Sequence, residues 1–343
     1  MFSYRHAFHA GNHADVLKHT TLIALMRYLK QKETALTVID THAGAGLYRL
    51  DSDYTETGGE ARDGVFRLFS EQNLTETKAG RAQAAIKTIA TAAIPSSSSA
   101  AIPASAAKKP SGATVWAPAL QAYLDLLRGL NPQFAETGNP AHLKIYPGSP
   151  FIAQQFLTGR DKLKLFELHP TDFKSLTGNI EQLGVGRQVS VAREDGFETL
   201  KTFLPPPSRR ALVFCDPSYE LKSDYGQTHA CMLDAVKRFA TGTYAVWYPI
   251  IPRPEAHDLP RKLKTLAVKA DRSWLNASLT VKSSKLTTDT ATLETIRPGL
   301  PASGIFIINP PHTLKVELQA ALVQMVARLG QDRNASFALE SGG

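Results

Sequence analysis

Three short polar segments each follow an apolar run that reads as a β-strand, and together their side chains suit a nucleoside ligand. Asp40-Thr41-His42-Ala43-Gly44-Ala45-Gly46 has the small residues that let a backbone turn tightly and approach a ligand. Glu167 ends the run Leu163–Phe166, where a carboxylate can accept hydrogen bonds from ribose hydroxyls. Asp195-Gly196 follows the run Gln188–Ala192, where a carboxylate can contact the amine of an adenine ring. Taken alone, the glycine-rich segment also fits a tight loop, Glu167 fits a charge at a helix N-terminus equally well, and Asp195-Gly196 fits a turn better.

A fourth segment, Asp216-Pro217-Ser218-Tyr219, follows the near-continuous apolar run 211–215. Asp-Pro also occurs where an ordinary strand ends, so this segment is stronger evidence for a ligand site in combination with the other three than it is alone. Four polar segments at the ends of four different strands would meet at one edge of a parallel sheet, which is where open α/β sheets bind ligands. The glycine-rich segment lacks the third glycine of the dinucleotide pattern, since Arg49 stands near that position. A nicotinamide dehydrogenase is therefore disfavoured.

The elements that must position these segments alternate between strand and helix patterns. Strand patterns end near each polar segment and continue at 243–250, 274–281 and 304–309, with helix patterns at 16–30, 150–157, 170–183, 225–240 and 254–268. Such alternation predicts a mostly parallel sheet with helical crossovers. The polar stretch 282–303 has no helical period, so we expect a hairpin there that makes one of the last two strands antiparallel.

An insert interrupts this pattern. Residues 92–113 are almost all Ala, Ser, Pro, Lys and Gly, which provide too little apolar surface to offset the entropy of ordering. The flanks 65–69, 81–90 and 120–130 read as helices. We therefore predict a main domain of residues 1–50 and 143–343 and an inserted helical subdomain of residues 51–142 with a flexible tip at 92–113.

The order and chemistry of the four segments resemble S-adenosylmethionine-dependent methyltransferases. Asp216-Pro217-Ser218-Tyr219 is similar to the Asp/Asn-Pro-Pro-Tyr signature of the enzymes that methylate an exocyclic amine. Ser218 replaces the second proline, which keeps the backbone carbonyl but frees φ. A similar Asn309-Pro310-Pro311-His312 lacks the aromatic residue and follows what we expect to be an edge strand, so we interpret it as a structural strand exit.

The N-terminal stretch 3–19, which contains four histidines, narrows the resemblance to one family. None of its His residues has the spacing of a structural zinc site, so no metal is expected. Together with 40–46, 146–150, 167–170 and 238–244, this stretch closely resembles the ribosomal RNA large subunit methyltransferase J family over nearly the whole chain except 92–113.

That resemblance implies a Rossmann-like class I methyltransferase fold: a seven-stranded, mostly parallel sheet with one antiparallel strand, plus the inserted helical subdomain. It implies S-adenosylmethionine as cofactor and methylation of N6 of an adenosine in 23S rRNA, the family being that of the adenine 2030 enzyme. Asp216 would be the catalytic residue and Tyr4 would contact the RNA, while Pro217 and Tyr219 would also contact the substrate. The implied cofactor contacts are His19, His42, Ser149, Glu167, Asp195, Gly196 and Asp216.

The implied chemistry places demands on the site. An adenine amine is a poor nucleophile because its lone pair is delocalised into the ring, so we expect the Asp216 carboxylate and the Pro217 carbonyl to accept its two N–H groups. Tyr219 would stack on the base. The target adenine must be single-stranded or flipped to reach such a pocket.

Composition fits a globular protein with a nucleic-acid partner. The 343 residues include 39 Lys+Arg against 31 Asp+Glu, which gives a formal net charge of +8, and the window 253–285 has eight basic against three acidic residues. Such clusters favour phosphate backbones, although a solvated helix face would look the same. Two cysteines and no apolar leader predict a reduced, cytoplasmic protein without a membrane partner, and we expect a monomer.

Two alternatives to rRNA methylation stay open at this point. Asp-Pro-x-Tyr chemistry also permits methylation of DNA adenine or of another exocyclic amine, such as that of a protein glutamine. The chain could also be a non-enzymatic RNA-binding protein on a methyltransferase fold, although it retains Asp216, Tyr219, Glu167 and Asp195. Only the N-terminal resemblance favours ribosomal RNA.

The prediction that residues 92–113 form a flexible tip outside the core can be tested directly. Deleting residues 92–113 should change the melting temperature by less than about 2 °C, because a segment with so little apolar surface contributes little to the core. Scanning calorimetry of the two chains measures this. A larger loss of stability would mean that the segment is packed.

Overall fold

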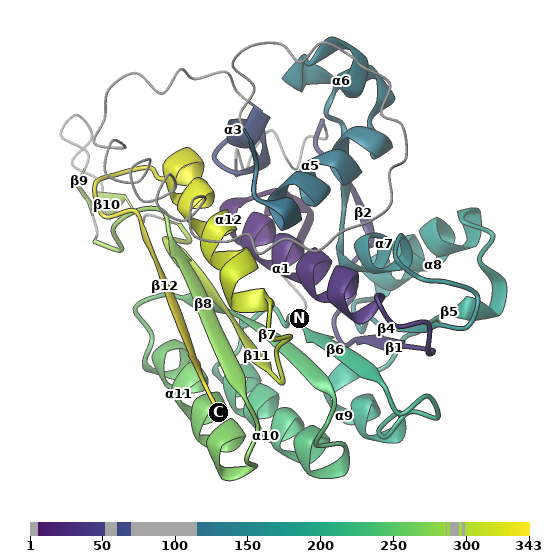
Figure 1. Cartoon of the computed structure of the whole chain (residues 1–343). Coiled ribbons are helices and arrows are strands. Elements are labelled where there is room, and N and C mark those ends of the chain that lie inside the picture. The colour runs from purple at the N-terminus through teal and green to yellow at the C-terminus, as the bar shows by residue number, and fades with distance from the viewer. Residues whose placement is uncertain (1–5, 52–59, 70–114, 286, 289–294, 297–298) are drawn as a thin grey trace, which may run out of the picture.

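A computed structural model gives the fold and describes residues 6–51, 60–69, 115–285, 287–288, 295–296 and 299–343 (Figure 1). None of the described helices is long and apolar enough to cross a lipid bilayer. The helices are α1 (His13–Leu29), α3 (Val65–Phe69), α5 (Pro118–Leu130), α6 (Pro132–Thr137), α7 (Ser149–Gln154), α8 (Pro170–Gln182), α9 (Gly196–Thr199), α10 (Lys222–Arg238), α11 (Pro254–Lys269) and α12 (Leu314–Leu329). The strands are β1 (Thr37–Asp40), β2 (Leu47–Arg49), β3 (Ile145–Pro147), β4 (Lys162–Phe166), β5 (Val189–Ala192), β6 (Ala211–Cys215), β7 (Thr243–Ile250), β8 (Trp274–Thr280), β9 (Thr287–Thr288), β10 (Thr295–Ile296), β11 (Ala302–Ile308) and β12 (Ser336–Gly342).

The main sheet has eight strands in the order β12-β8-β11-β7-β6-β1-β4-β5. Strands β5, β4, β1, β6 and β7 pair in parallel, which confirms the predicted α/β fold with a mostly parallel sheet. The chain passes from β1 to β4 on one side and returns to β6 on the other. The carboxyl end of β1 is therefore the topological switch point, where sheets of this kind open a crevice for a ligand.

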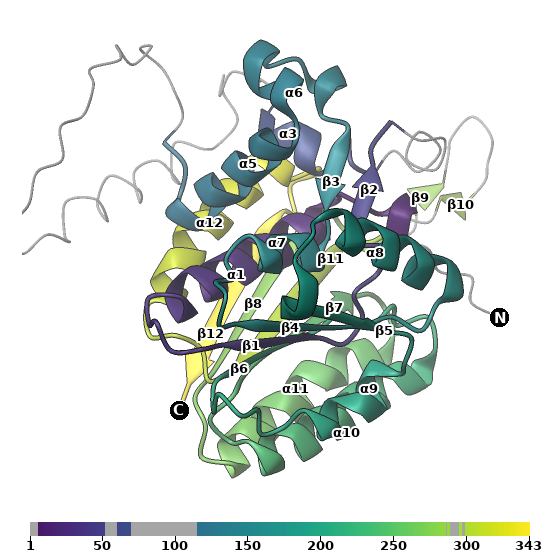
Figure 2. The same ribbon diagram turned by 90° about the vertical axis from the view of Figure 1, so that its right-hand side faces the viewer.

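Helices cover both faces of the sheet, which explains why its central strands are apolar throughout (Figure 2). In β6, Leu212 and Phe214 point into the core shared with α1, α5, α7 and α12. Val213 and Cys215 point into the opposite core, which includes residues of α10 and α11. Because side chains alternate across a strand, only a continuous apolar run fills both cores.

The end of the sheet farthest from β5 is antiparallel. Strand β11 runs antiparallel to both β7 and β8. This confirms the prediction that one of the strands at 274–281 and 304–309 is antiparallel. The prediction of seven strands with one antiparallel strand is wrong, however, because β12 adds an eighth strand antiparallel to β8, so that both β11 and β12 run against the parallel strands. Strand β12 forms the edge of the sheet, and its side chains alternate between half-buried and exposed over most of its length, so it lacks the apolar run that revealed the inner strands.

The segment that follows β11 is a structural exit, as predicted, but for a different reason. Strand β11 lies between β7 and β8, so it is not the edge strand that the sequence suggested. Since β11 is antiparallel to β7, its carboxyl end lies at the sheet edge opposite to that of β6. There the Asn309 side-chain amide donates to the carbonyls of Ala240 and Gly242 at 2.8 and 2.7 Å, which ties the exit to the start of β7.

Helix α12 was not predicted, although its sequence carries the signal. Leu314, Leu318, Leu322, Met325 and Leu329 recur at helical spacing and are all buried. The helix packs against α1, α5 and β8. It thereby completes the layer of helices above the antiparallel end of the sheet (Figures 1 and 2).

The proposed insert begins and ends beside the sheet. The chain leaves through β2 and returns through β3, which pairs antiparallel with β2. Helices α3 and α5 form where the sequence predicted them, and both pack against α12. The predicted helix 81–90 and the tip 92–113 lie outside the described residues, so the domain boundaries at 51 and 142 stay a prediction.

A buried carboxylate joins three segments at the amino ends of the parallel strands. Asp161 has a fully buried side chain. Its oxygens accept hydrogen bonds from the backbone amides of Leu36 and Thr158 at 2.8 and 2.7 Å. One of them also forms an ion pair with Lys30 at 2.5 Å. This one residue therefore fixes the end of α1 relative to the start of β1 and the turn before β4.

Replacing this carboxylate should destabilise the whole fold. We expect Asp161→Ala to lower the free energy of unfolding by about 3 kcal/mol, because it leaves the largely buried ammonium group of Lys30 and the backbone amides of Leu36 and Thr158 without their acceptor. Asp125→Ala is the matched control: Asp125 pairs with Arg128 on an exposed turn of α5, and its loss should cost less than about 0.5 kcal/mol. Urea unfolding measures both values. Equal losses in the two variants would contradict the proposed role of Asp161.

Candidate active site

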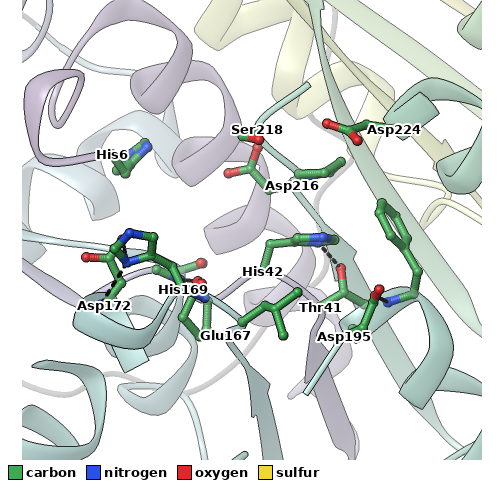
Figure 3. A pocket seen from close by; sticks show the side chains of 18 of the residues that line it. His6, Thr41, His42, Glu167, His169, Asp172, Asp195, Asp216, Ser218 and Asp224 are labelled. Carbon is green, nitrogen blue, oxygen red and sulfur yellow. Dashed lines mark hydrogen bonds and ion pairs between the residues drawn. The ribbon is translucent and has the colours of Figure 1, made fainter. Parts of the chain in front are cut away.

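A cavity of about 370 Å³ opens where the parallel strands end, within the range of about 300–1,000 Å³ typical of small-molecule sites. Figure 3 shows side chains from the ends of β1, β4 and β6 and from the start of α9 around this space. The structure brings together eight of the ten residues that the sequence singled out: His19, His42, Ser149, Glu167, Asp195, Gly196, Asp216 and Pro217 all line the cavity.

Glycines let the backbone form one wall of the cavity. Gly44 adopts a positive φ of 61°, and its amide donates to Glu167 Oε2 at 2.8 Å. Gly196 lies against the turn after β1, where a Cβ atom would sit 2.0 Å from the carbonyl oxygen of Thr41. No larger residue fits at position 196 without moving the backbone, so this glycine sets how closely the ends of β1 and β5 approach.

Glu167 stands at the end of β4, as predicted. Its Oε1 accepts the amide of His169 at 2.7 Å, and its Oε2 accepts the amide of Gly44. Burial raises the pKa of Glu167, while these two hydrogen bonds oppose the rise. Each carboxylate oxygen has a second lone pair, so the side chain can still accept hydrogen bonds from two ligand hydroxyls.

The two predicted histidines are neutral. Burial lowers the pKa of His42 and of His19 to about 3 in each case. His42 Nδ1 lies 2.8 Å from the hydroxyl of Thr41, a contact drawn in Figure 3. His19 Nδ1 lies 2.8 Å from the hydroxyl of Tyr146. Each ring therefore presents a neutral imidazole to the cavity.

Asp195 and Ser149 each stand at the start of a helix. Asp195 Oδ1 accepts the amide of Phe197 at 2.9 Å and so caps α9, which leaves its other oxygen available on the cavity side. Ser149 is the first residue of α7 and is buried. Both residues reach the cavity because the chain turns at the carboxyl edge of the sheet.

Asp216 is held by a buried lysine. Lys18 Nζ lies 2.6 Å from Asp216 Oδ2 and 2.8 Å from Asp15 Oδ1, and its side chain is 5% exposed. Burial by itself would lower the pKa of Lys18, but the two carboxylates outweigh it and raise that pKa. Burial would likewise raise the pKa of Asp15, but the neighbouring His6 and Lys18 hold that pKa well below its usual value. The ammonium group is therefore charged and fixes one oxygen of Asp216.

Sequence reasoning missed Lys18 as a site residue. The reason that Lys18 needs a partner is visible only in the structure, where every residue of α1 from His13 to Met26 is buried. The identity of that partner was not readable, since Asp216 lies 198 positions away.

Two predicted substrate contacts are not seen at the cavity. Tyr4 lies outside the described residues. Tyr219 is 3% exposed, donates its hydroxyl proton to the carbonyl of Trp247 at 2.7 Å and packs against Tyr225. The predicted stacking of Tyr219 on a base does not fit this arrangement, because the positive φ of 54° at Tyr219 turns the side chain into the core beneath the loop.

The charge of the cavity favours a cationic ligand. Its described lining contains one lysine, no arginine and seven carboxylates, namely Glu167, Asp172, Glu194, Asp195, Asp216, Glu220 and Asp224. Lys18 is engaged by two carboxylates, so the remaining acidic groups produce a negative potential. A ligand with a sulfonium or ammonium group matches this lining, whereas a pyrophosphate does not.

A further carboxylate, Asp40, lies behind the cavity wall at the end of β1. Its side chain is almost fully buried, and Oδ1 accepts the amide of His42 at 3.2 Å. Burial raises the pKa of Asp40 to about 7, and the charges of Asp216 and Glu167 add to the rise, while hydrogen bonds from Ser149 and His42 oppose it. Asp40 therefore changes its charge near neutral pH.

Comparisons with known proteins agree with the sequence resemblance. The model of a family described as ribosomal RNA large subunit methyltransferase D, RlmJ, matches residues 33–91 and 113–339. Two curated proteins named ribosomal RNA large subunit methyltransferase J are each 34% identical to this chain. The protein from Haemophilus influenzae aligns over 340 residues, covering 99% of this chain and 98% of the relative. The protein from Escherichia coli K12 aligns over 330 residues, covering 96% and 94%.

A solved structure is also similar over nearly its whole length. The crystal structure of a protein from Legionella pneumophila strain Philadelphia 1 matches this fold with a TM-score of 0.71 at 27% sequence identity. The match covers 98% of this chain and 99% of that chain. The described fold is therefore shared by a natural protein of nearly the same extent.

Titration of Asp40 should make stability fall as pH rises. The pKa of this carboxyl is 3.8 in a model peptide and about 7 in the folded protein, so between these values the folded state holds a proton that the unfolded chain has lost. From pH 5 to pH 8 this costs the wild type about 3 kcal/mol. Asp40→Asn should remove that loss, so the stability of the variant relative to wild type should rise with pH.

Urea unfolding at pH 5 and pH 8 measures the difference. The exposed Asp271→Asn is the matched control and should keep the wild-type pH profile. A constant offset between Asp40→Asn and wild type at the two pH values would show that Asp40 does not titrate in this range.

Proposed function

The chain belongs to the ribosomal RNA large subunit methyltransferase J family, and we propose on that basis that it transfers a methyl group from S-adenosylmethionine to N6 of an adenosine in 23S ribosomal RNA. The position of Asp216 is the observation that supports an amine as the group that receives the methyl group. Its carboxylate borders the cavity at the end of a central strand, next to Pro217, and one of its oxygens is fixed by Lys18.

The cavity suits the cofactor. When bound, S-adenosylmethionine supplies a methyl group on a positively charged sulfur. We propose that Glu167 accepts hydrogen bonds from the ribose hydroxyls and that Asp195 and Gly196 contact the adenine. His19, His42, Ser149 and Asp216 complete the proposed contacts, and all seven of these residues line the one cavity.

The chemical task of the protein is to make a weak nucleophile available. Conjugation with the purine ring delocalises the lone pair of the adenine amine, and acceptors placed on its two N–H bonds favour a pyramidal nitrogen. Lys18 engages Oδ2 of Asp216, and no hydrogen bond to Oδ1 occurs among the described residues. We propose that Oδ1 of Asp216 and the carbonyl of Pro217 accept the two N–H groups, and that Oδ1 takes the proton that N6 loses when it gains the methyl group. Positioning and electrostatics then supply most of the acceleration.

Tyr219 contributes from beneath the loop in this arrangement. Its hydroxyl binds the carbonyl of Trp247, and its own carbonyl accepts from Arg253 at 3.2 Å. These contacts hold the loop that carries Pro217 and Ser218, which compensates for the freedom that a serine allows where the signature has a second proline.

The form of the substrate follows from the size and position of the cavity. A purine inside a duplex cannot reach carboxylates at the end of a strand, so we propose that the target adenine is single-stranded or flipped out of its helix. We further propose that Tyr4 contacts the RNA and that the enzyme acts as a monomer in the cytoplasm.

Removing the carboxylate should abolish the reaction but keep the fold, because Asp15 still pairs with the buried Lys18. Asp216→Ala should lower methyl transfer by at least about 10³-fold, because it removes an acceptor needed in the transition state. The assay uses isotopically labelled S-adenosylmethionine and unmodified 23S rRNA, followed by nucleoside mass spectrometry, with a DNA duplex as a second substrate. Near-normal turnover would contradict the proposed role of Asp216. Methylation of the DNA but not of the rRNA would contradict the proposal that 23S rRNA is the substrate.

A matched control is available on α10. Asp234 is a half-exposed carboxylate that pairs with Arg238 outside the cavity, so Asp234→Ala should retain wild-type turnover. Thermal melting of both variants separates a lost reaction from a lost fold.

A further inference from the structure

Two buried tyrosines connect the helix α5 to the cavity. His19 Nδ1 on α1 lies 2.8 Å from the hydroxyl of Tyr146 on β3, and that hydroxyl lies 3.0 Å from the hydroxyl of Tyr123 on α5. The two tyrosines are fully buried and His19 is 1% exposed. Water therefore does not compete for these hydrogen bonds, and their donors and acceptors must be matched within the chain of three side chains.

Only one direction of the hydrogen bonds among these three side chains gives every proton an acceptor. Tyr123 has no other hydrogen-bond partner among the described residues, so the oxygen of Tyr146 is the acceptor for its proton. Tyr146 must then donate its own proton to His19 Nδ1. The reverse direction would leave the proton of Tyr123 without an acceptor in a buried site, which costs about 1–3 kcal/mol.

The direction sets the tautomer of the histidine. Burial keeps the imidazole neutral, with its pKa lowered to about 3, so the ring carries one proton. Since Nδ1 accepts from Tyr146, that proton resides on Nε2. No partner for Nε2 occurs within the described part of the chain, and the ring lines the cavity.

We propose that Tyr146 is a positioning residue that holds His19 in the Nε2–H tautomer, so that the cavity presents a hydrogen-bond donor to an acceptor oxygen of the cofactor. This inference rests on the proposed function for the identity of the ligand. A donor at this point is useful, because the surrounding acidic lining offers a ligand oxygen few donors.

The contact also links α5 to the site. Tyr123 lies on the face of α5 that carries Leu120, Leu124 and Leu127 into the core. Apolar packing of these leucines would hold the helix in place without any hydroxyl group. The hydroxyl of Tyr123 therefore adds a polar link from the proposed insert to a residue that lines the cavity.

The test combines the tautomer with cofactor affinity. Selective ¹⁵N labelling of histidine and long-range ¹H–¹⁵N spectra report which ring nitrogen of His19 carries the proton, with no ligand present. Wild type should show Nε2–H, and Tyr146→Phe should show a mixture of tautomers. Titration calorimetry with S-adenosylmethionine should give a Kd about three- to tenfold weaker for Tyr146→Phe. Tyr123→Phe should keep the tautomer and stay within about twofold of the wild-type Kd, because Tyr146 still has His19 as its acceptor.

Tyr244→Phe is the matched control. Tyr244 is equally buried and donates to the backbone carbonyl of Ala235 at 2.9 Å, but it lies in the opposite core and does not border the cavity. It should leave both the His19 tautomer and the Kd unchanged. Equal effects of Tyr146→Phe and Tyr244→Phe on Kd, or an Nδ1–H proton in wild type, would overturn the proposal. Failure of wild type to bind S-adenosylmethionine would instead contradict the proposed function, while the spectra still test the tautomer.

Discussion

The candidate site depends on one buried ammonium group between two carboxylates. Lys18 joins Asp15, in the first turn of α1, to Asp216, at the end of β6, and all three side chains are largely removed from water. Buried charges are tolerated only when paired, so the helix and the strand cannot separate without exposing or orphaning a charge. This constraint fixes the first helix over the carboxyl edge of the parallel strands and determines which oxygen of Asp216 remains free.

Much of the fold and site could be predicted because the relevant signals are local. An apolar run followed by Asp, Glu or Gly marks the end of a strand, and parallel strands bring such ends to one edge. Six of the eight proposed residues that meet at the cavity stand at such strand ends, whereas His19 and Ser149 were implied only by the family resemblance. The pairing of Lys18 with Asp216 and the tyrosine link to His19 join distant parts of the chain. No local period carries that information.

The errors also have physical causes. Strand β12 is half-exposed at the edge of the sheet, so it lacks the continuous apolar run of a strand covered on both faces. Tyr219 was expected at the cavity because its neighbours Asp216 and Pro217 lie there, but a positive backbone φ sends its ring into the opposite core. Sequence proximity predicted where the backbone goes, and one dihedral angle decided where the side chain goes.

The pairing of β2 with β3 has an evolutionary consequence. These strands bring Arg49 and Ile145 together beside the glycine-rich turn, whatever the length of chain between them. The entropy of closing such a loop grows only logarithmically, by about 0.6 kcal/mol for each doubling of its length. The length of chain between β2 and β3 can therefore change at small entropic cost, while the register of the two strands keeps its ends in place beside the cavity.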